Sequence, residues 1–151
     1  MALKDLRFDV PFNVAFEKGL VLVGDIEPDT EYNQNRNAPA RQKVDPVTGL
    51  RQWKATATNP AETNPKKSSI QVIFLADVAP VPSTPEVLPG MRSIVLENVT
   101  LQPKVTGQGE FKTLGWTVRA TGIAGDNSGA KVPAADPGAA RPARGQSDKA
   151  A

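Results

Sequence analysis

A group of basic residues around a tryptophan has the residue types and the spacing that could do chemistry. Five cations lie within nineteen residues and are opposed there only by Asp45: Arg36, Arg41, Lys43, Arg51 and Lys54. Trp53 stands beside the last of them. Cations attract phosphate, and an aromatic ring stacks on any base without reading its sequence. The group is therefore typical of a surface that meets a single nucleic-acid strand.

Further residues could extend this surface. Tyr32 lies in a polar loop, and Phe111 stands beside Lys112 in a turn flanked by glycines. Both rings are candidates for base stacking, which contributes about 1–3 kcal/mol per base. More cations could lengthen the track: Lys66, Lys67, Lys104, Lys112 and Arg119.

The two tryptophans have a competing role in the core. Trp53 shares strand parity with two small alanines, Ala55 and Ala57, and Trp116 shares it with Val118 and Ala120. Side chains of one parity lie on one face of a strand, so small residues beside a large ring are typical of a core layer. The pattern predicts that Trp116 lies in the core and leaves both roles open for Trp53.

Catalytic and metal chemistry receive little support from the sequence. Histidine and cysteine are absent, which removes the commonest general base, the commonest metal ligand and all thiolate sites. Four carboxylates at every second residue could hold a hard cation: Asp25, Glu27, Asp29 and Glu31. Pro28 interrupts them and no ligand-loop glycine follows, so a solvated strand face is the favoured interpretation. The sequence therefore predicts no enzyme, no cofactor and no metal.

Charge is distributed unevenly along the chain. The net charge of the 151 residues is +2, but residues 1–31 hold three Lys/Arg against seven acids. Residues 32–124 hold eleven Lys/Arg against six acids. A segregated basic region indicates a polyanionic partner. No signal-like or membrane-length apolar stretch is visible, so we expect a soluble, cytoplasmic protein without a membrane partner.

Alternating apolar residues predict the elements that must position these side chains. Phe8–Phe16 reads as a half-buried strand with Pro11 at an edge or bulge. Turn residues 45–49 separate the two arms of a hairpin, 41–44 and 50–58. The other predicted strands are 20–23, 69–76, 94–105 with a bulge near Asn98, and 114–124.

Five to seven strands without a helical layer predict one all-β domain. We expect a small Greek-key, OB-like barrel with extended loops over residues 1–124. Residues 125–151 are rich in Ala, Gly and Pro and lack large apolar residues after Val132. Such a segment cannot bury enough surface to offset its ordering entropy, so we predict a disordered tail.

Several blocks of sequence, in this order, resemble a known family. They are Val21–Pro28, Val44–Trp53, Pro80–Pro82 and Trp116–Ile123. The likeness spans about residues 6–124 and is to the replication, integration and excision activator family of actinobacterial plasmids and integrative elements. Its most specific part, D-x-x-T-G-x-x-x-W, also resembles single-strand-binding proteins of the OB class. By this resemblance the residues carried over are Asp45, Thr48, Gly49, Trp53, Arg119 and Ala120.

The resemblance implies a role in replicating or transferring the DNA of a plasmid or other mobile genetic element. We expect a non-enzymatic protein that binds single-stranded DNA. The expected partners are that DNA, replication or transfer proteins and, as an alternative to a monomer, a second copy in a homodimer. One alternative is a regulator of excision and replication that acts through a protein partner or duplex DNA. Another is a scaffold that binds only protein. The end of the tail, Gln146–Ala151, lacks the acidic cluster with which bacterial single-strand-binding proteins recruit partners.

Overall fold

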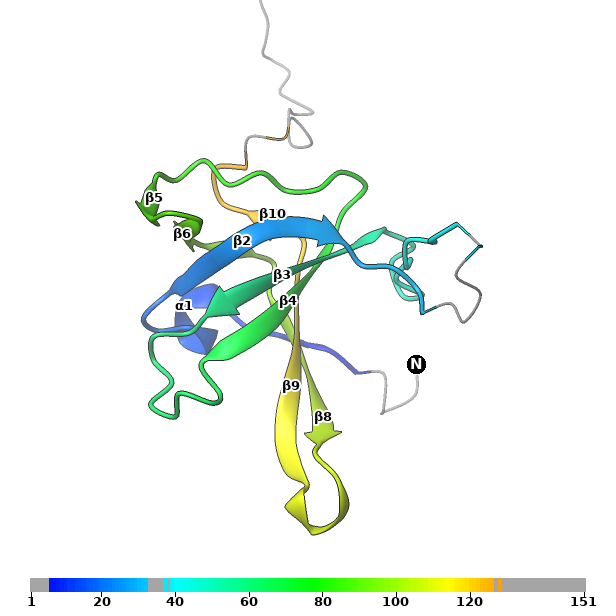
Figure 1. Cartoon of the computed structure of the whole chain (residues 1–151), viewed down its shortest axis with the longest axis vertical. Coiled ribbons are helices and arrows are strands. Elements are labelled where there is room, and N and C mark those ends of the chain that lie inside the picture. Colours follow the sequence, from blue (N-terminus) through cyan, green and yellow to red (C-terminus); the bar gives the residue numbers. More distant parts are fainter. Residues whose placement is uncertain (1–5, 33–36, 38, 127, 129–151) are drawn as a thin grey trace, which may run out of the picture.

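The protein is all-β in the computed structural model, as the alternation predicted (Figure 1). The structure describes residues 6–32, 37, 39–126 and 128, so the predicted tail lies almost wholly outside the described residues. In chain order the elements are β1 (Phe8–Asp9), α1 (Phe12–Ala15), β2 (Leu20–Pro28), β3 (Gln52–Thr58), β4 (Ser69–Leu75), β5 (Glu86–Leu88), β6 (Met91–Ile94), β7 (Leu96–Glu97), β8 (Thr100–Thr106), a 3-10 turn (Gly109–Phe111), β9 (Thr113–Ala120) and β10 (Gly122–Ile123). No helix in this part of the chain is long and apolar enough to cross a membrane.

The strand order is that of a Greek key. Strands β2, β3 and β4 pair antiparallel in sequence, and β6 returns after a long connection to lie beside β2. This gives the spatial order fourth, first, second, third that defines the motif. Strand β9 then joins the other side of β4 in parallel, and β8 pairs antiparallel with β9. The complete order is β1-β8-β9-β4-β3-β2-β6-β5.

One run of chain connects the two sides of this sheet. Residues 91–94 form β6 beside β2, and residues 100–106 form β8 beside β9. Between them β7 pairs with β10 in a separate two-stranded sheet. Asn98 has a φ of 52°, a left-handed conformation that ends one strand and lets the next begin. The strand order of the eight-stranded sheet ends at β1 and β5, and these two strands do not pair with each other, so the closed barrel of the prediction is not detected among the described residues.

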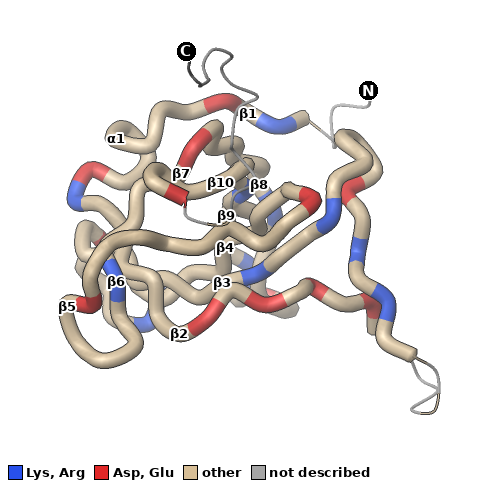
Figure 2. Tube along the Cα trace, turned by 90° about the horizontal axis from the view of Figure 1, so that it is seen from above, with Lys and Arg blue, Asp and Glu red and all other residues tan. Residues whose placement is uncertain are grey.

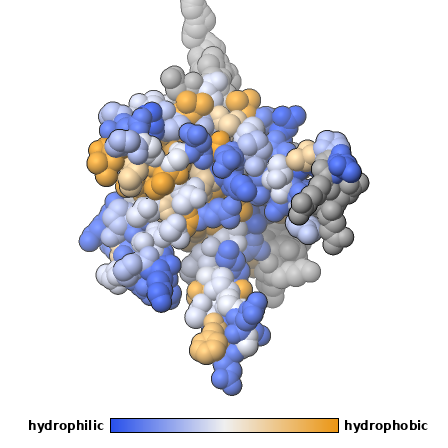
Figure 3. Space-filling model, viewed as in Figure 1, coloured by the Kyte–Doolittle hydropathy of each residue, from blue (hydrophilic) through white to orange (hydrophobic). Residues whose placement is uncertain are grey.

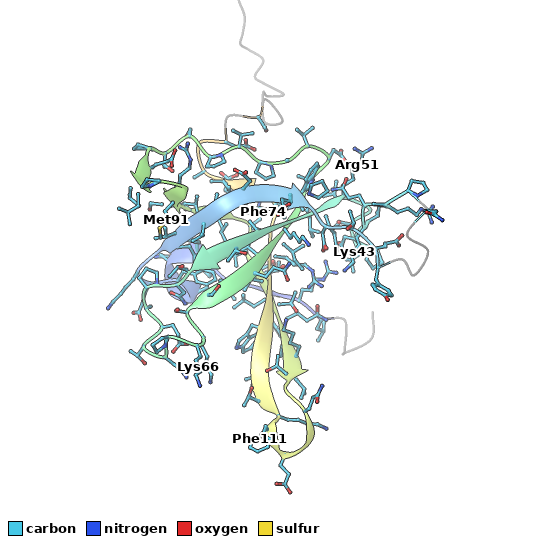
Figure 4. The ribbon with its side chains drawn as sticks, viewed as in Figure 1. Lys43, Arg51, Lys66, Phe74, Met91 and Phe111 are labelled. Carbon is cyan, nitrogen blue, oxygen red and sulfur yellow. The ribbon has the colours of Figure 1, made fainter. Side chains whose placement is uncertain are left out.

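The core lies between the curled strands. Its fully buried side chains come from every long strand except β8 and include Phe74, Leu20, Leu22, Ile94, Ile123 and Val72. Figure 4 shows Phe74 in the middle of the molecule. Ala55 and Ala57 of β3 are also buried. Their parity fixes which face of β3 and β4 is turned outward.

The predicted strand Phe8–Phe16 is wrong beyond Asp9. The chain instead forms the single helical turn α1, preceded by Pro11 with a φ of −58°. Proline has the φ of a helix and lacks the N–H that a first turn leaves unpaired, so it favours a helix start. Phe12 and Phe16 are also four residues apart, and their rings pack with centroids 5.5 Å apart. The apolar spacing of this run fits both the two-residue period of a strand and the four-residue spacing of a helical turn. Burial of Phe16 against the core favours the helical turn.

Candidate nucleic-acid interface

The outward face of the central strands carries a polar surface. Because Ala55, Val72 and Val118 point into the core, their neighbours on each strand point out. Register places outward residues side by side, with Lys54 opposite Ile73 and Ile73 opposite Arg119. The next pairs along are Thr56 with Gln71, and Gln102 with Thr117. Acidic side chains are absent from these positions on β3, β4, β8 and β9, although Glu27 of β2 stands opposite Lys54 at their border. This part of the face therefore presents cations and hydrogen-bonding groups together.

A groove opens at one end of this face. Strands β4 and β9 pair only over residues 72–74 and 118–120, and the β8–β9 hairpin then leaves the body of the molecule (Figure 1). The groove between this hairpin, β4 and the β3–β4 loop has a volume of about 690 Å³. Figure 3 shows the surface indented there. Among the described residues that line the groove are three lysines and one acid: Lys66, Lys67, Lys104 and Glu62.

Trp116 lies in this groove, and the prediction that it belongs to the core is wrong. Its parity with Val118 and Ala120 is as predicted, and those two are buried, but Trp116 is 48 % exposed. The reason is that the hairpin outruns the sheet: Trp116 faces Pro103 across the hairpin and has no paired residue on β4. An aromatic ring is therefore exposed in a groove whose lining includes lysines, away from the predicted basic hairpin.

Trp53 has the opposite environment. It is half-buried and packs against the hydrophobic core, continuing the layer of Ala55 and Ala57. Its indole Nε1 donates a hydrogen bond of 2.8 Å to the carbonyl oxygen of Ala76. A ring fixed in this way inside the protein has little surface left for a base, so the structure favours the core role that the sequence left open.

Residues 45–49 form the predicted turn, but the predicted first arm, 41–44, forms only isolated bridges, and the second arm becomes a strand, β3, from Gln52. The cations of this hairpin are accompanied by acids. Asp45 N–H donates to Leu50 O, Val44 bridges to Arg51, and Gln52 N–H donates to Lys43 O. Arg41, Lys43 and Arg51 are exposed. Lys43 Nζ lies 3.8 Å from an Asp29 carboxylate oxygen, and Lys54 stands opposite Glu27. Glu31 N–H donates to Arg41 O, which holds a third acid beside the arm.

The predicted carboxylate row thus serves as a partner of the predicted basic cluster. Figure 2 shows acidic and basic residues close together around the end of β2. The described residues hold no group of three acids that could bind a metal ion. Arg36 lies outside the described residues. The hairpin remains a candidate binding surface, but the neighbouring acids make its positive electrostatic potential weaker than its cations alone would give.

Asp45 explains the turn part of the D-x-x-T-G-x-x-x-W block. Its side chain is fully buried and accepts two hydrogen bonds from Arg7, Nη1 at 3.0 Å and Nη2 at 2.6 Å. It also accepts the Thr48 N–H at 3.0 Å and the Thr48 hydroxyl at 2.8 Å. Gly49 adopts a φ of 75°, which glycine tolerates best. The block is therefore a self-contained turn.

The charge state of Asp45 follows from these contacts. Burial alone would raise the pKa of this carboxyl, but hydrogen bonds from Arg7 and Thr48 and the charge of Arg7 outweigh burial and lower the pKa to about 2. The Arg7–Asp45 pair thus stays ionised at neutral pH and joins the N-terminal segment to the turn. No pattern in the sequence indicated this role for Arg7, since the two residues are 38 positions apart.

The remaining predicted residues lie apart from one another. Phe111 is 83 % exposed at the tip of the β8–β9 hairpin, next to the exposed Lys112. Tyr32 is 86 % exposed at the end of the β2 segment. Figure 4 places Lys43 and Arg51 on one side of the molecule and Lys66 on the other. The structure therefore separates the predicted residues into a hairpin group and a group around the groove, with Lys54 and Arg119 on the face between them.

No family model, no curated protein and no solved structure matches this chain.

Proposed function

We propose that the protein binds single-stranded DNA along the outward face of β3, β4, β9 and β8, entering at the groove. The observation that carries this proposal is one groove lined by three lysines and by the half-exposed Trp116. Trp116 has the parity of Val118 and lies on the other face of the β8–β9 hairpin from Lys104, and the groove, which opens where β9 separates from β4, is lined by residues of both faces. Covering an exposed aromatic ring lowers its free energy, and a nucleotide base offers a flat face that can cover it. Duplex DNA keeps its base faces stacked, so this combination suits a single strand.

The lysines supply the second half of the proposal. A single strand bound by phosphate contacts loses affinity as salt rises, with a slope of about −0.7 per phosphate neutralised. Backbone contacts and stacking do not read base edges, so we expect little sequence preference. In the OB class the face of the second and third strands and two loops bind oligonucleotides, and by analogy we assign this role to β3, β4 and the β8–β9 hairpin. A role in replicating or transferring a mobile element is proposed on the resemblance alone.

Two triple variants with the same change of charge test the location. Lys66, Lys67 and Lys104 change to Ala in the first, and Arg41, Lys43 and Arg51 change to Ala in the second. Fluorescence anisotropy would follow a labelled mixed-sequence strand, and the matching duplex, at several salt concentrations. We expect the groove variant to flatten the salt slope by about 2. We expect a smaller change in the hairpin variant, because neighbouring acids already offset its cations.

Three outcomes would contradict the proposal. Equal affinity for the duplex would remove the preference for single strands, and a larger effect in the hairpin variant would move the site. If no DNA binds at low salt, the remaining candidate function is a regulator that acts through a protein partner. That alternative has an observation of its own in the apolar side chains that the β8–β9 hairpin exposes: Val105, Phe111 and Leu114.

A further inference from the structure

A second pocket lies where the N-terminal segment and the Asp45–Gly49 turn pack over the outward face of the sheet. It has a volume of about 700 Å³. Its lining comes from five segments, namely the N-terminal segment, the Asp45–Gly49 turn, β3, β8 and β9: Arg7, Asp45, Pro46, Val47, Gln52, Gln102 and Arg119. The pocket adjoins the groove, because Gln102 stands two residues before Lys104 on the same face of β8.

One of its two guanidinium groups is fixed in position. Both terminal nitrogens of Arg7 bind Asp45, while its Nε is buried and has no hydrogen-bond partner among the described residues. The carboxylate is in turn occupied by Thr48. Asp45 therefore holds Arg7 rigidly.

The other guanidinium has no acid of its own. Arg119 Nη1 donates to Gln102 Oε1 at 2.7 Å, and its Nε is buried without a partner in the described part of the chain. No described carboxylate lies within ion-pair distance of it. Burial, followed by the charge of Arg7, lowers the pKa of Arg119 against an opposing effect of Asp45, although a guanidinium stays protonated. Two cations thus share one buried acid.

We propose that the Arg7–Arg119 pocket binds one phosphate group, which in the complex is a backbone phosphate of the bound strand. The second clause rests on the proposed function. Guanidinium groups match phosphate oxygens in geometry and charge, and buried N–H donors without a partner cost free energy until an acceptor arrives. Two like charges held together also repel each other, and a phosphate relieves that repulsion. A strand that leaves the groove past Lys104 and Thr117 next meets Gln102 and Arg119.

Side-chain NMR of the arginine Nε–H groups tests the pocket directly. Buried Nε–H protons exchange slowly enough to be seen, so sodium phosphate is titrated against sodium chloride of equal ionic strength. We expect saturable shifts of the Arg7 and Arg119 signals with phosphate alone. Arg119→Gln should weaken phosphate binding by about tenfold or more. The control is Arg92→Gln, since Arg92 is bound on β6 to Thr84 and Glu86.

Single-stranded DNA distinguishes the source of the phosphate. Arg119→Gln should flatten the salt slope for a single strand by about 0.7, and the strand should shift the same Nε–H signals and be displaced from them by free phosphate. Phosphate binding without DNA binding would keep the pocket and refute the proposed function. DNA binding with an unchanged slope and unshifted Nε–H signals would refute the pocket alone. If Arg119→Gln does not fold, the titration of the unaltered protein decides.

Discussion

The two tryptophans have opposite environments, and only Trp116 departs from its predicted place in the core. Trp53 stands among cations but is bound to Ala76 and packed on the core, whereas Trp116 stands in an apolar run but is half-exposed beside lysines. Both share parity with buried residues, so parity identifies the face of the strand but not whether another element covers it. Whether another element covers that face depends on residues elsewhere in the chain, so it cannot be read from the sequence of the strand itself.

Replacing each tryptophan by alanine separates these roles. Trp53→Ala should lower the free energy of unfolding by about 3 kcal/mol, at the lower end of the range for buried aromatics because the ring is partly exposed. Trp116→Ala should change stability by less than about 1 kcal/mol and lower the affinity for a single strand by about 1–3 kcal/mol. Urea unfolding and anisotropy measure the two quantities. A stable Trp53→Ala protein that has lost DNA binding would return Trp53 to the interface.

Asp45 gives the protein a defined response to acid. Its pKa is about 2 in the folded protein and about 3.9 in an unfolded chain, so folding favours the ionised form. The stabilisation, about 2 kcal/mol, is complete above the unfolded pKa and is lost as the pH falls toward 2. Asp45→Asn should cost about 3 kcal/mol at pH 7, because Arg7 loses its partner. The stability difference between the two proteins should therefore shrink between pH 5 and pH 2.

An exposed carboxylate supplies the control for this experiment. Asp25 lies on β2 and is exposed, so Asp25→Asn should change stability by less than about 0.5 kcal/mol. Urea unfolding at a series of pH values gives all three curves. A difference between Asp45→Asn and the parent that stays constant from pH 5 to pH 2 would mean that Asp45 is not the titrating group.

At the scale of elements, the sequence predicts strands well where one period is visible. The predicted strands 20–23 and 69–76 correspond to β2 and β4. The predicted strand 114–124 is instead divided at Thr121 into β9 and β10, which belong to different sheets, and 94–105 is divided among β6, β7 and β8. The predicted irregularity near Asn98 is the left-handed residue between β7 and β8. Phe8–Phe16 failed because its apolar spacing satisfies a strand and a helical turn together. Burial of Phe16 against the core decided between them, and that contact is not local.

The candidate site was only partly predictable for a related reason. The second group of cations, including Lys66, Lys67 and Lys104, was visible as residue types in the sequence. Their convergence depends on the parallel pairing of β4 with β9, which joins segments about forty residues apart. The acids that accompany the hairpin of residues 41–58 converge on it in the same way, because β2 pairs with β3. Spacing along the sequence therefore overestimated the net positive charge at the hairpin and did not show that the groove lysines converge.

The molecule as a whole has two differing ends. The groove and the Arg7–Arg119 pocket border β4, β8 and β9, while β5 and β6 lie at the other end of the strand order. Strand β5 is a free edge with exposed Val87 and Leu88. A strand bound across the proposed face would leave this end uncovered. Binding should therefore leave a one-sided footprint on the molecule.

Hydrogen exchange with and without a single-stranded oligonucleotide would reveal this footprint. A ligand suppresses the local opening of the elements that it contacts. We expect slower exchange in peptides covering 59–71 and 100–117 and unchanged exchange in those covering 86–94. High salt should erase the difference, since the contacts are largely electrostatic. Protection confined to residues 39–51 would place the bound DNA on the hairpin around the Asp45–Gly49 turn. Equal protection everywhere would contradict a one-sided interface.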